Sequence, residues 1–473
     1  MRLNANVVEK YKAIDEEYIN GLLAAEIAKN PKKIIVLDDD PTGVQTVHDV
    51  GVYTHWDKES IQRGFAEDKH IFFILTNSRA FTEEQTIKAH NEIFDVIDEV
   101  SKETGIEYII ISRGDSTLRG HWPLETEILR ERYEQSTGRK VDGEVICPFF
   151  KEGGRMTIDN IHYVRYGEEL VSANETEFAK DKTFGYTAET LPGYVEEKSH
   201  GRFKAADCTC IALEDIHDMN IDKIEAQLME VKDYNKVIVN AISRKDVKVF
   251  CVALYRAMAR GKVFMFRSAA AFVKVFANIK LQAFLTREQM VKDNSTKGGV
   301  IVVGSHTAKT TEQVEHLKEL NNIEFIELDA TLVKDDAAFK AEFERCLKLE
   351  EKYINEGKTV CCYTTRALIT ADTGNKEDEL KLAVKISDAV QNLVGKLNVR
   401  PAFVVAKGGI TSSDVGVKAM GVMRANVLGQ IGPGIPVWET GDRSKWPGIP
   451  YVIFPGNVGE AETLKEIAAK LIG

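Results

Sequence analysis

The stretch HIFFILTNSRAFTEEQTIKAHNEIFDVIDEVSKETGIEYIIIS, His70 to Ser112, contains the pattern that decides the fold class. Runs of consecutive apolar residues, IFFIL and YIII, stand near its two ends, and a helical pattern connects them. Strands that are apolar at consecutive positions and linked by helices are typical of parallel sheets covered on both faces. The stretch therefore predicts an α/β fold, in which the helix has an apolar stripe formed by Ile87, Ile93, Phe94, Ile97 and Val100.

The same alternation continues along the chain in two series. Strand-like runs are KKIIVL (32–37), GEVIC (143–147), CTCIAL (208–213), KVIVN (236–240), KVFMF (262–266), GVIVVG (299–304), TVCCYTT (359–365), PAFVVA (401–406) and YVIF (451–454). The polar segment TREQMVKDNSTKGG, 286–299, separates the two series. We expect two domains, residues 1–290 and 297–473, each with a mostly parallel sheet flanked by helices.

Composition narrows the classes of function. A chain of 473 residues is longer than one core usually supports, which agrees with two domains. The net charge of −11 argues against nucleic acid or an anionic membrane as the partner. The seven cysteines include no C-x-x-C, so we expect buried reduced thiols and a cytoplasmic protein. The charged N-terminus is not that of a signal peptide, and the oligomeric state is not fixed, so a homo-oligomer remains compatible.

Three adjacent carboxylates, Asp38, Asp39 and Asp40, follow the apolar run IIVL in the motif DDDPTG. Neighbouring like charges raise each other's pKa unless a cation, a hydrogen-bond donor or solvent compensates. The cluster therefore indicates a metal, an arginine or phosphate chemistry.

Other polar loops follow strands of the first domain. SRGDSTLRGHWPLE, 112–125, brings Arg113, Asp115, Ser116, Thr117, Arg119 and His121 together, and its arginines suit a carboxylate ligand. Gly153, Gly154 and Arg155 follow GEVIC, while Thr76, Asn77 and Arg79 follow IFFIL. Open α/β sheets bind ligands at the carboxyl ends of their strands, so these loops predict one site.

The second domain has glycines at the ends of its strands. Gly304-Ser305 leads to a helix with a capping-box pattern from Thr310 to Gln313, and Gly408-Gly409 leads to a helix near Thr411 to Ser413. Backbone amides at such turns suit phosphates. Two more Gly-rich loops are expected at LGQIGPGIPVWETG, 428–441, and IFPGNVGE, 453–460, and His306 within the first loop is expected to hydrogen-bond ligand or backbone. Neither the Walker motif nor the Rossmann fingerprint is present.

In their order, DDPTG, GDSTLRG, GGRMT, GSHTAKT, KGGITSSD, GQIGPGIP and PGNVGE resemble the motifs of the four-carbon acid sugar kinases. The resemblance runs from about Lys33 to Glu460, and DSTLRG is its most specific part. It implies an N-terminal domain that binds threonate, erythronate or 3-oxo-tetronate, a C-terminal domain that binds ATP, and an active site in the cleft between them. Phosphoryl transfer then uses Mg²⁺ and a carboxylate that receives the hydroxyl proton.

The resemblance also implies roles for residues. Asp39 and Asp40 are the candidate catalytic carboxylates. Candidates for substrate binding are Thr42, Gly43, Asp115, Ser116, Arg119 and Arg155. Candidates for nucleotide binding are Ser305, Gly408, Gly409, Ile410, Thr411 and Gly456, and no metal ligand is assigned. The family usually has a lysine ahead of DSTLRG and a KSGNFG-like ending, whereas this chain has Arg113-Gly114 and FPGNVG, which leaves the choice of acid open.

Two alternatives remain open on the residues alone. IIVLDDDPT also fits the D-x-D-x-T motif of haloacid dehalogenase-like phosphatases, in which Asp38 would be the nucleophile and Asp40 the acid and base. FFILTNS would be their second motif, although the Gly-rich second half then has no role. A non-catalytic protein that binds a sugar acid and a nucleotide would need the same pockets without turnover.

Overall fold

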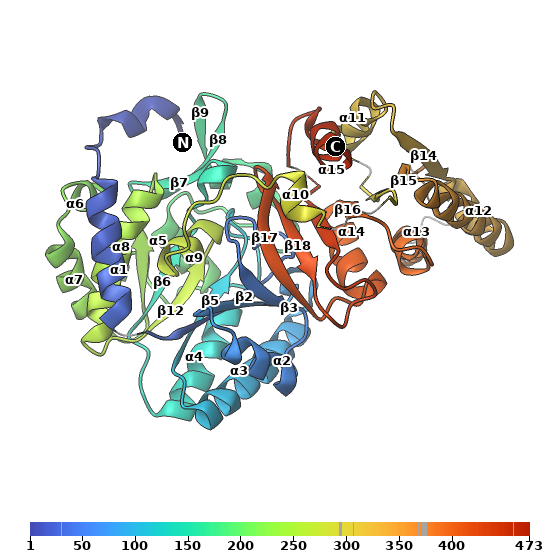
Figure 1. Ribbon diagram of the computed structural model, residues 1–473. Helices are drawn as coiled ribbons and strands as arrows, with labels where there is room; N and C mark the ends of the chain where they lie inside the picture. Colours follow the sequence, from blue (N-terminus) through green and yellow to red (C-terminus); the bar gives the residue numbers. More distant parts are fainter. Residues whose placement is uncertain (30, 293–295, 306, 367–368, 371–375, 457) are drawn as a thin grey trace. The chain divides into compact units, whose positions relative to one another are not determined.

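The computed structural model describes residues 1–473 apart from 30, 293–295, 306, 367–368, 371–375 and 457, and gives only the backbone of 376, 377 and 380 (Figure 1). The chain forms two compact units. Unit 1 comprises Met1–Thr46 and His55–Leu281, and unit 2 comprises Val47–Thr54 and Gln282–Gly473. The expected division into 1–290 and 297–473 lies close to this one. It differs because 282–290 and the short early segment 47–54 belong to unit 2.

Unit 1 is built on a parallel sheet whose strands are buried along nearly their whole length. Each expected run of the first series forms a strand of this sheet. The spatial order is β10 (Thr209–Ile211), β11 (Asn235–Val239), β6 (Gly143–Cys147), β12 (Phe264–Ser268), β5 (Tyr108–Arg113), β2 (Lys33–Asp38) and β4 (Ile71–Leu75). Parallel strands end at the same edge, so the loops after β2, β4, β5 and β12 meet at the carboxyl edge.

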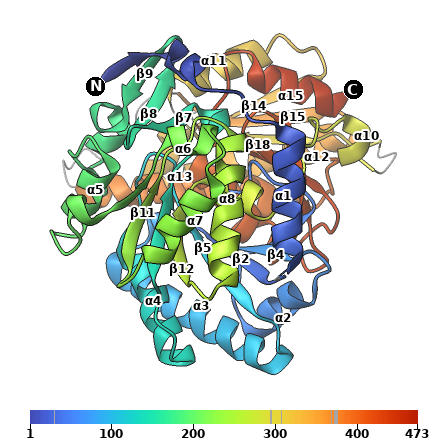
Figure 2. The same ribbon diagram turned by 90° about the vertical axis from the view of Figure 1, so that its left-hand side faces the viewer.

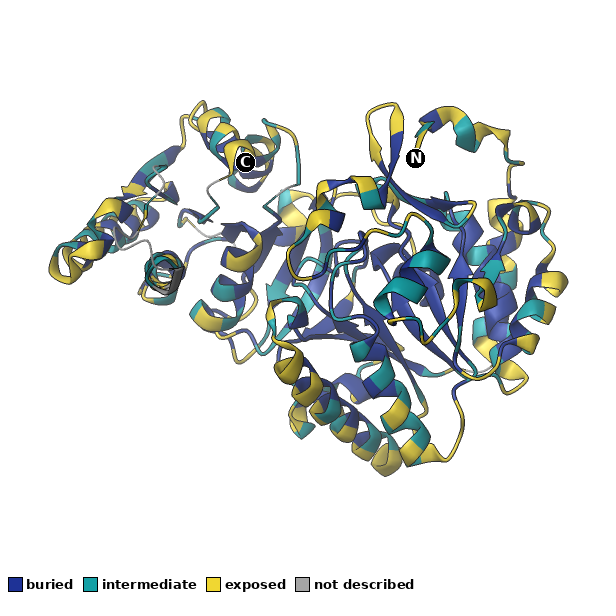
Figure 3. Ribbon diagram, turned by 180° about the vertical axis from the view of Figure 1, so that it is seen from behind, coloured by how far each residue is buried: buried dark blue, intermediate teal, exposed yellow. Residues whose placement is uncertain are grey.

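Helices cover both faces of this sheet. Because crossovers between parallel strands are right-handed, the strand order places α3 (Glu83–Thr104) and α4 (Leu124–Thr137) on one face and α8 (Arg244–Ala259) on the other. The helices α1 (Glu16–Lys29) and α7 (Ile221–Glu230) pack beside α8 (Figure 2). Shorter helices of the unit are α2 (Lys58–Ala66), α5 (Leu191–Lys198), α6 (Leu213–His217) and α9 (Ala270–Phe276). Figure 3 shows the strands buried, with exposed residues on the outer sides of the helices.

The apolar stripe of α3 differs from the prediction at one position. Ile93, Phe94, Ile97 and Val100 are buried as expected, but Ile87 is 39% exposed. The buried positions of the first turns are Thr86, Ala89 and His90, because the stripe continues back from Ile93 in steps of three and four residues. Ile87 lies one residue, or about 100°, beyond this stripe.

A small antiparallel sheet in unit 1 was not predicted. Its order is β1 (Arg2–Asn4), β9 (Glu169–Ser172), β8 (Ile161–Tyr166) and β7 (Arg155–Ile158). Strand β7 begins at Arg155. The turn at Gly153-Gly154 directly before it therefore fixes the position of this arginine at the end of the sheet.

Unit 2 has a sheet that is antiparallel at one side and parallel at the other. The order is β3 (Val50–Tyr53), β17 (Arg424–Gly432), β18 (Ile435–Thr440), β19 (Pro450–Phe454), β16 (Val404–Lys407), β13 (Val300–Val303), β15 (Thr359–Thr364) and β14 (Ile323–Leu328). The pairs from β19 to β14 are parallel. All strands expected in the second series are confirmed.

The expected Gly-rich loop at 428–441 is instead a hairpin. Strands β17 and β18 pair across the short turn at Pro433-Gly434, where Gly434 has a φ of 71°. Between the glycines, buried and less buried residues alternate as they do in a strand, and Ile431, Ile435 and Val437 are among the buried ones. This correction removes one candidate phosphate loop.

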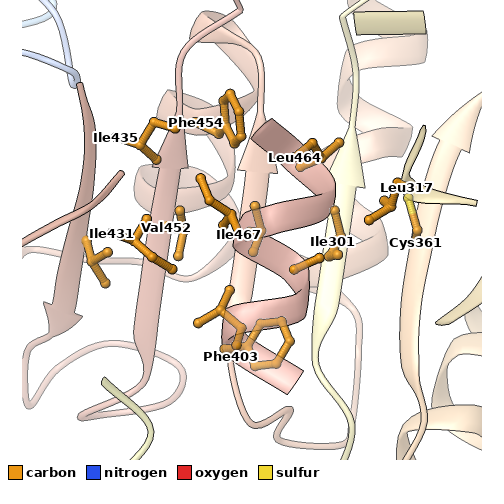
Figure 4. Close-up of a cluster of buried hydrophobic side chains, with 14 of the residues drawn as sticks. Ile301, Leu317, Cys361, Phe403, Ile431, Ile435, Val452, Phe454, Leu464 and Ile467 are labelled. Atoms are coloured by element: carbon orange, nitrogen blue, oxygen red, sulfur yellow. The ribbon is translucent and has the colours of Figure 1, made fainter. Parts of the chain in front are cut away.

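The core of unit 2 lies between this sheet and its helices. Leu464 and Ile467 of α15 (Thr463–Ile472) project onto the strands that carry Ile301, Val452 and Phe454 (Figure 4). The remaining helices are α10 (Arg287–Met290), α11 (Ala308–Leu317), α12 (Asp336–Asn355), α13 (Lys376–Gly395) and α14 (Gly409–Asp414).

All seven cysteines are free thiols. Cys361 and Cys362 are buried in β15 as expected, whereas Cys208 and Cys210 are only half-buried, at the edge strand β10. Across the part of the chain that the structure describes, no helix combines the length and the apolar character that a membrane span requires.

Candidate functional site

The three aspartates after β2 have three different environments. Asp38 is 2% exposed, and Arg113 Nη1 on the neighbouring strand β5 donates to its Oδ1 at 3.1 Å. Burial raises the pKa of Asp38 to about 7, against the opposing effect of Arg113. A Cβ atom on Gly43 would lie 1.9 to 2.0 Å from the Asp38 carboxylate oxygens. The DDPTG turn therefore covers this carboxylate, and Gly43 is required for the turn to close.

Asp39 and Asp40 share one arginine that comes from the loop after β4. Arg79 donates from Nη2 to Asp39 Oδ1 at 2.6 Å and from Nε to Asp39 Oδ2 at 3.2 Å, and from Nη1 to Asp40 Oδ2 at 3.0 Å. Asp39 is 3% exposed, and burial raises its pKa although Arg79 opposes this. Asp40 is 22% exposed. Burial would raise the pKa of Asp40, but Arg79 and a hydrogen bond from Thr42 lower it below its usual value.

The loop after β5 contributes a second acid–base pair. Arg119 Nε donates to Asp115 Oδ2 at 2.8 Å, four residues away. Burial opposes ionisation of Asp115, yet Arg79 and Arg119 hold its pKa far below the usual range. Asp115 is thus a charged group that orients Arg119, with Thr117 donating to the same carboxylate.

Arg155 lies near Arg119 against the same aromatic ring. The guanidinium carbons of Arg119 and Arg155 lie 5.2 and 5.3 Å from the centroid of Phe178. Burial lowers the pKa of Arg155, and its Nε has no hydrogen-bond partner among the described residues. Arg155 Nη1 donates to the Gly153 carbonyl, and no ion pair among the described residues includes Arg155. Two adjacent guanidinium groups, one without a counter-ion, form a region suited to an anion.

Ser116 and His121 are held by their surroundings. His162 Nε2 donates to the Ser116 carbonyl at 2.7 Å, and burial lowers the pKa of His162 to about 4. His121 Nε2 donates to the Phe81 carbonyl at 3.0 Å, and its ring packs edge-on against Phe184. These contacts fix the backbone of the loop that carries Asp115 and Arg119.

Sequence reasoning missed the central role of Arg79 and did not consider Arg267. Arg79 was noticed only as part of a polar loop, yet it contacts both Asp39 and Asp40. Arg267 lies inside strand β12 and is 3% exposed. An arginine within an apolar run, in KVFMFRS, was the signal that could have found it.

In unit 2, three loops after adjacent parallel strands come close together. A Cβ atom on Gly408 would lie 3.2 Å from Thr411 Oγ1 and 3.4 Å from Ser305 Cβ, and one on Gly456 would lie 3.8 Å from Gly408 Cα. The structure thus brings together Ser305, Gly408, Thr411 and Gly456, four of the candidates for nucleotide binding. Gly408 lies close against Ser305 and Thr411, whereas a Cβ atom on Gly409 would meet nothing within 4 Å, so the open space is at Gly409.

Hydroxyl groups surround the first of these loops. Helix α11 begins one turn earlier than predicted, because Thr307 is its N-cap and accepts from the Thr310 amide. The expected capping box from Thr310 to Gln313 is therefore wrong. Thr310 Oγ1 instead donates to Ser305 Oγ at 3.1 Å. Helix α14 begins at Gly409, slightly before the expected Thr411, with Gly408 at a φ of 126°.

Two further residues complete the description of this region. Lys407 has no exposed surface, and its Nζ donates to the Pro455 carbonyl at 2.7 Å. Burial lowers the pKa of Lys407 to about 7. Ile410, in contrast, is 74% exposed at the start of α14. His306 and Asn457, which belong to two of the predicted loops, lie outside the described residues.

A protein-built metal cage is absent from the described residues, since no three acidic, histidine or cysteine side chains converge suitably. Mg²⁺ commonly binds through one or two carboxylates together with substrate phosphates. Among the three aspartates after β2, Asp40 has the most accessible carboxylate, at 22% exposure, and is the one that could serve as such a ligand.

The two halves of the chain match two described domains. Residues 34–276 match the model of a "Sugar-binding N-terminal domain", and residues 300–464 match that of a "Nucleotide-binding C-terminal domain". A comparison with curated proteins finds no match.

Two solved structures with a similar fold come from bacteria. A Haemophilus influenzae protein, HI1011, is 18% identical with a TM-score of 0.62, covering 93% of this chain and all of its own. A Salmonella typhimurium protein, provisionally described as a tRNA synthase, is 16% identical with a TM-score of 0.66, covering 92% of this chain and 98% of its own. At this level of identity, the likeness concerns the fold alone.

Proposed function

Because the chain belongs to the four-carbon acid sugar kinase family, with a sugar-binding and a nucleotide-binding domain, we propose that it phosphorylates a four-carbon sugar acid with ATP. The acceptor would be the terminal hydroxyl of threonate, erythronate or 3-oxo-tetronate. Unit 1 would bind the acid and unit 2 the nucleotide. The residues of each unit support this assignment in different ways.

The observation that carries the proposal is the pair of guanidinium groups on Phe178. Arg119 is oriented by Asp115, and Arg155 lacks a carboxylate partner among the described residues. A sugar acid would supply the missing carboxylate, and its carbon chain would carry hydroxyl groups toward the neighbouring aspartates. A guanidinium holds a carboxylate through two parallel hydrogen bonds, which fixes orientation as well as charge.

Asp40 is the proposed general base. Its lowered pKa keeps it ionised at neutral pH, and its 22% exposure leaves it accessible to a hydroxyl. Asp39 is an alternative by sequence, but it is only 3% exposed and both its oxygens accept from Arg79. The oxygens of Asp40 accept from Thr42 and Arg79, yet its side chain is the more accessible of the two. We therefore assign proton acceptance to Asp40 and the orientation of Arg79 to Asp39.

The nucleotide phosphates would bind at the glycine loops of unit 2. Ser305 and Thr411 offer hydroxyl groups, and Gly408, Gly409 and Gly456 allow a phosphate to approach backbone amides. Ile410 would contact the nucleotide through its exposed side chain. Magnesium, brought by the nucleotide, would neutralise charge on the phosphate oxygens.

The geometry disfavours the phosphatase alternative. A nucleophilic Asp38 would have to reach a phosphorus atom, yet it is 2% exposed, lies under the turn at Gly43 and is paired with Arg113. Attack by a side chain in this position would require the DDPTG turn to open. No observation favours this reaction over phosphoryl transfer from ATP.

One experiment separates the three hypotheses. ADP formation is measured by a coupled assay with ATP and magnesium, with and without each four-carbon acid. A kinase forms ADP only with its acid, and mass spectrometry then finds the phosphorylated acid. Release of phosphate from a sugar phosphate without ATP would instead support a phosphatase. Binding of acid and nucleotide by calorimetry without turnover would support a non-catalytic protein.

A further inference from the structure

Arg267 is a buried arginine in the middle of the unit 1 sheet, outside every predicted motif. It lies on β12, beside Ser112 of β5, and only 3% of its surface is exposed. A buried guanidinium has a large desolvation cost unless charges and hydrogen bonds compensate for it. We propose that Arg267 is a positioning residue of the sugar-acid site, which holds the 114–120 loop and presents a positive charge to Asp39.

The first support is a direct bond to the loop. Arg267 Nη2 donates to the Arg119 carbonyl at 2.7 Å. This bond fixes the backbone of the residue whose side chain is paired with Asp115. Arg267 Nη1 is buried and has no hydrogen-bond partner among the described residues. Nη1 lies against Gly114 and Nη2 is bonded to Arg119, so the guanidinium contacts the loop rather than solvent.

The second support explains two glycines of the GDSTLRG motif. A Cβ atom on Gly114 would lie 1.1 Å from Arg267 Nη1, so no side chain fits there while Arg267 keeps its place. A Cβ atom on Gly120 would lie 3.2 Å from Arg267 Nη2 and 3.4 Å from Asp39 Oδ2. Gly120 also has a φ of 122°. The first and last residues of the motif, Gly114 and Gly120, thus both lie against the Arg267 guanidinium.

The third support is the distribution of charge. Burial raises the pKa of Asp39, while Arg79, Arg113 and Arg267 act in the opposite direction. Burial also opposes ionisation of Glu125 on α4, yet His90 and Arg267 help to keep its pKa below the usual value. The charge of Arg267 thus favours the ionised forms of two buried carboxylates, Asp39 and Glu125.

The expected kinetic effect rests on the proposed function. Loss of Arg267 should release the Arg119 backbone and weaken binding of the acid, because a misplaced guanidinium loses its bidentate geometry. The nucleotide should bind as before, since its proposed residues belong to unit 2. A merely structural arginine would change stability without this selectivity.

The test compares Arg267→Met and Arg267→Lys with a matched control, Arg256→Met. Arg256 is less buried, at 27% exposure, and its Nε donates to Glu26 at 3.0 Å, but it contacts no site residue. Arg267→Met should raise KM for the acid about tenfold or more, with KM for ATP unchanged. Arg267→Lys should recover part of this loss, because it restores the charge but not the planar fork. Arg256→Met should lower the melting temperature without changing either KM.

A second measurement does not depend on turnover. Amide hydrogen exchange of the free protein should be faster in residues 114–120 of Arg267→Met than in wild type, and unchanged there in Arg256→Met. Unchanged exchange in this loop would overturn the inference. If the wild type phosphorylates none of the acids, the proposed function fails, while the exchange comparison still decides the role of Arg267.

A double substitution tests the contact with Gly114. Gly114→Ala should displace the Arg267 side chain and give the same faster amide hydrogen exchange in residues 114–120 as Arg267→Met. Added to Arg267→Ala, which vacates the space, the same substitution should have little further effect. Fully additive effects would contradict the proposed contact.

Discussion

The two candidate sites occupy the same place in their sheets, the carboxyl ends of parallel strands, but they are built differently. In unit 1 the site consists of charged side chains that depend on each other, with Arg79 joined to Asp39 and Asp40, and Arg119 to Asp115. In unit 2 it consists of glycines and hydroxyl groups, with backbones in close approach. Buried charges must be matched in place, so changes in unit 1 should be costly and specific. Substitutions in unit 2 should instead act by filling the space that the glycines leave free.

Asp40→Asn is expected to have the largest effect. The amide cannot accept the hydroxyl proton, so kcat should fall by about a hundredfold to ten-thousandfold. KM for ATP should change little. Steady-state kinetics of the coupled assay checks this.

The control for that prediction is the neighbouring residue. Asp38→Asn should keep much of the ATP-dependent activity, because Asp38 is buried under Gly43. A phosphoryl group trapped on Asp38, or an Asp38→Asn variant as inactive as Asp40→Asn, would contradict the roles assigned to the two carboxylates.

Arg119→Lys comes next. A lysine keeps the charge but cannot bind a carboxylate through two parallel bonds. A loss of about 1.5 to 3 kcal/mol corresponds to a decrease of roughly ten- to hundredfold in kcat/KM for the acid. Nucleotide affinity, measured by calorimetry, should stay unchanged. Weaker ATP binding in this variant would instead assign Arg119 to the phosphate.

Gly408→Ala tests unit 2. The new Cβ would lie 3.4 Å from Ser305 Cβ at a backbone φ of 126°, so nucleotide affinity should fall about tenfold, with acid binding unaffected. Gly421→Ala is the matched control, since Gly421 also has a positive φ, 58°, but has open space around it. Both variants should lose about 1 kcal/mol of stability, and only the first should lose nucleotide. Equal nucleotide affinity in both would remove Gly408 from the site.

The smallest expected effect concerns Lys407 and pH. Burial lowers its folded-state pKa to about 7, below the value of an unfolded chain. Above pH 7 the unfolded state therefore binds more protons, and stability should rise with pH relative to Lys407→Met, by at most about 1.4 kcal/mol per pH unit. Urea unfolding of both proteins near pH 7 and about two units higher measures this difference. Parallel pH dependence of the two proteins would show that Lys407 stays charged in the fold.

Most strands of the parallel sheets were predictable from sequence, because they are buried on both faces and read as continuous apolar runs. The parallel edge strand β14 was missed, because its sequence IEFIEL alternates and Glu327 is exposed. Strands with one exposed face were missed, among them β7 to β9 and the hairpin of β17 and β18. Their glycines and alternating residues resemble those of loops. Segment 50–53 could not be assigned to unit 2, because its partner β17 is remote in sequence.

The candidate site was predicted in its motifs but not in its connections. Asp40, Asp115 and Arg119 lie in polar loops directly after strands, and this pattern can be recognised within one short segment of sequence. The contact between Arg267 and the 114–120 loop depends on β12 lying next to β5, although the two are far apart in the chain. Only the strand order reveals such a pairing.

Strand β3 has a consequence for synthesis of the chain. Tyr53 and its partner Arg424 are 371 residues apart, so β3 leaves the ribosome long before β17 exists. At about 5 to 20 residues per second, this interval is roughly 20 to 70 s. During it, VGVY is an apolar strand without its β17 partner, a state prone to pairing with other chains. For this interval the nascent chain therefore contains β3, the first strand of unit 2, before its partner strand β17 has been synthesised.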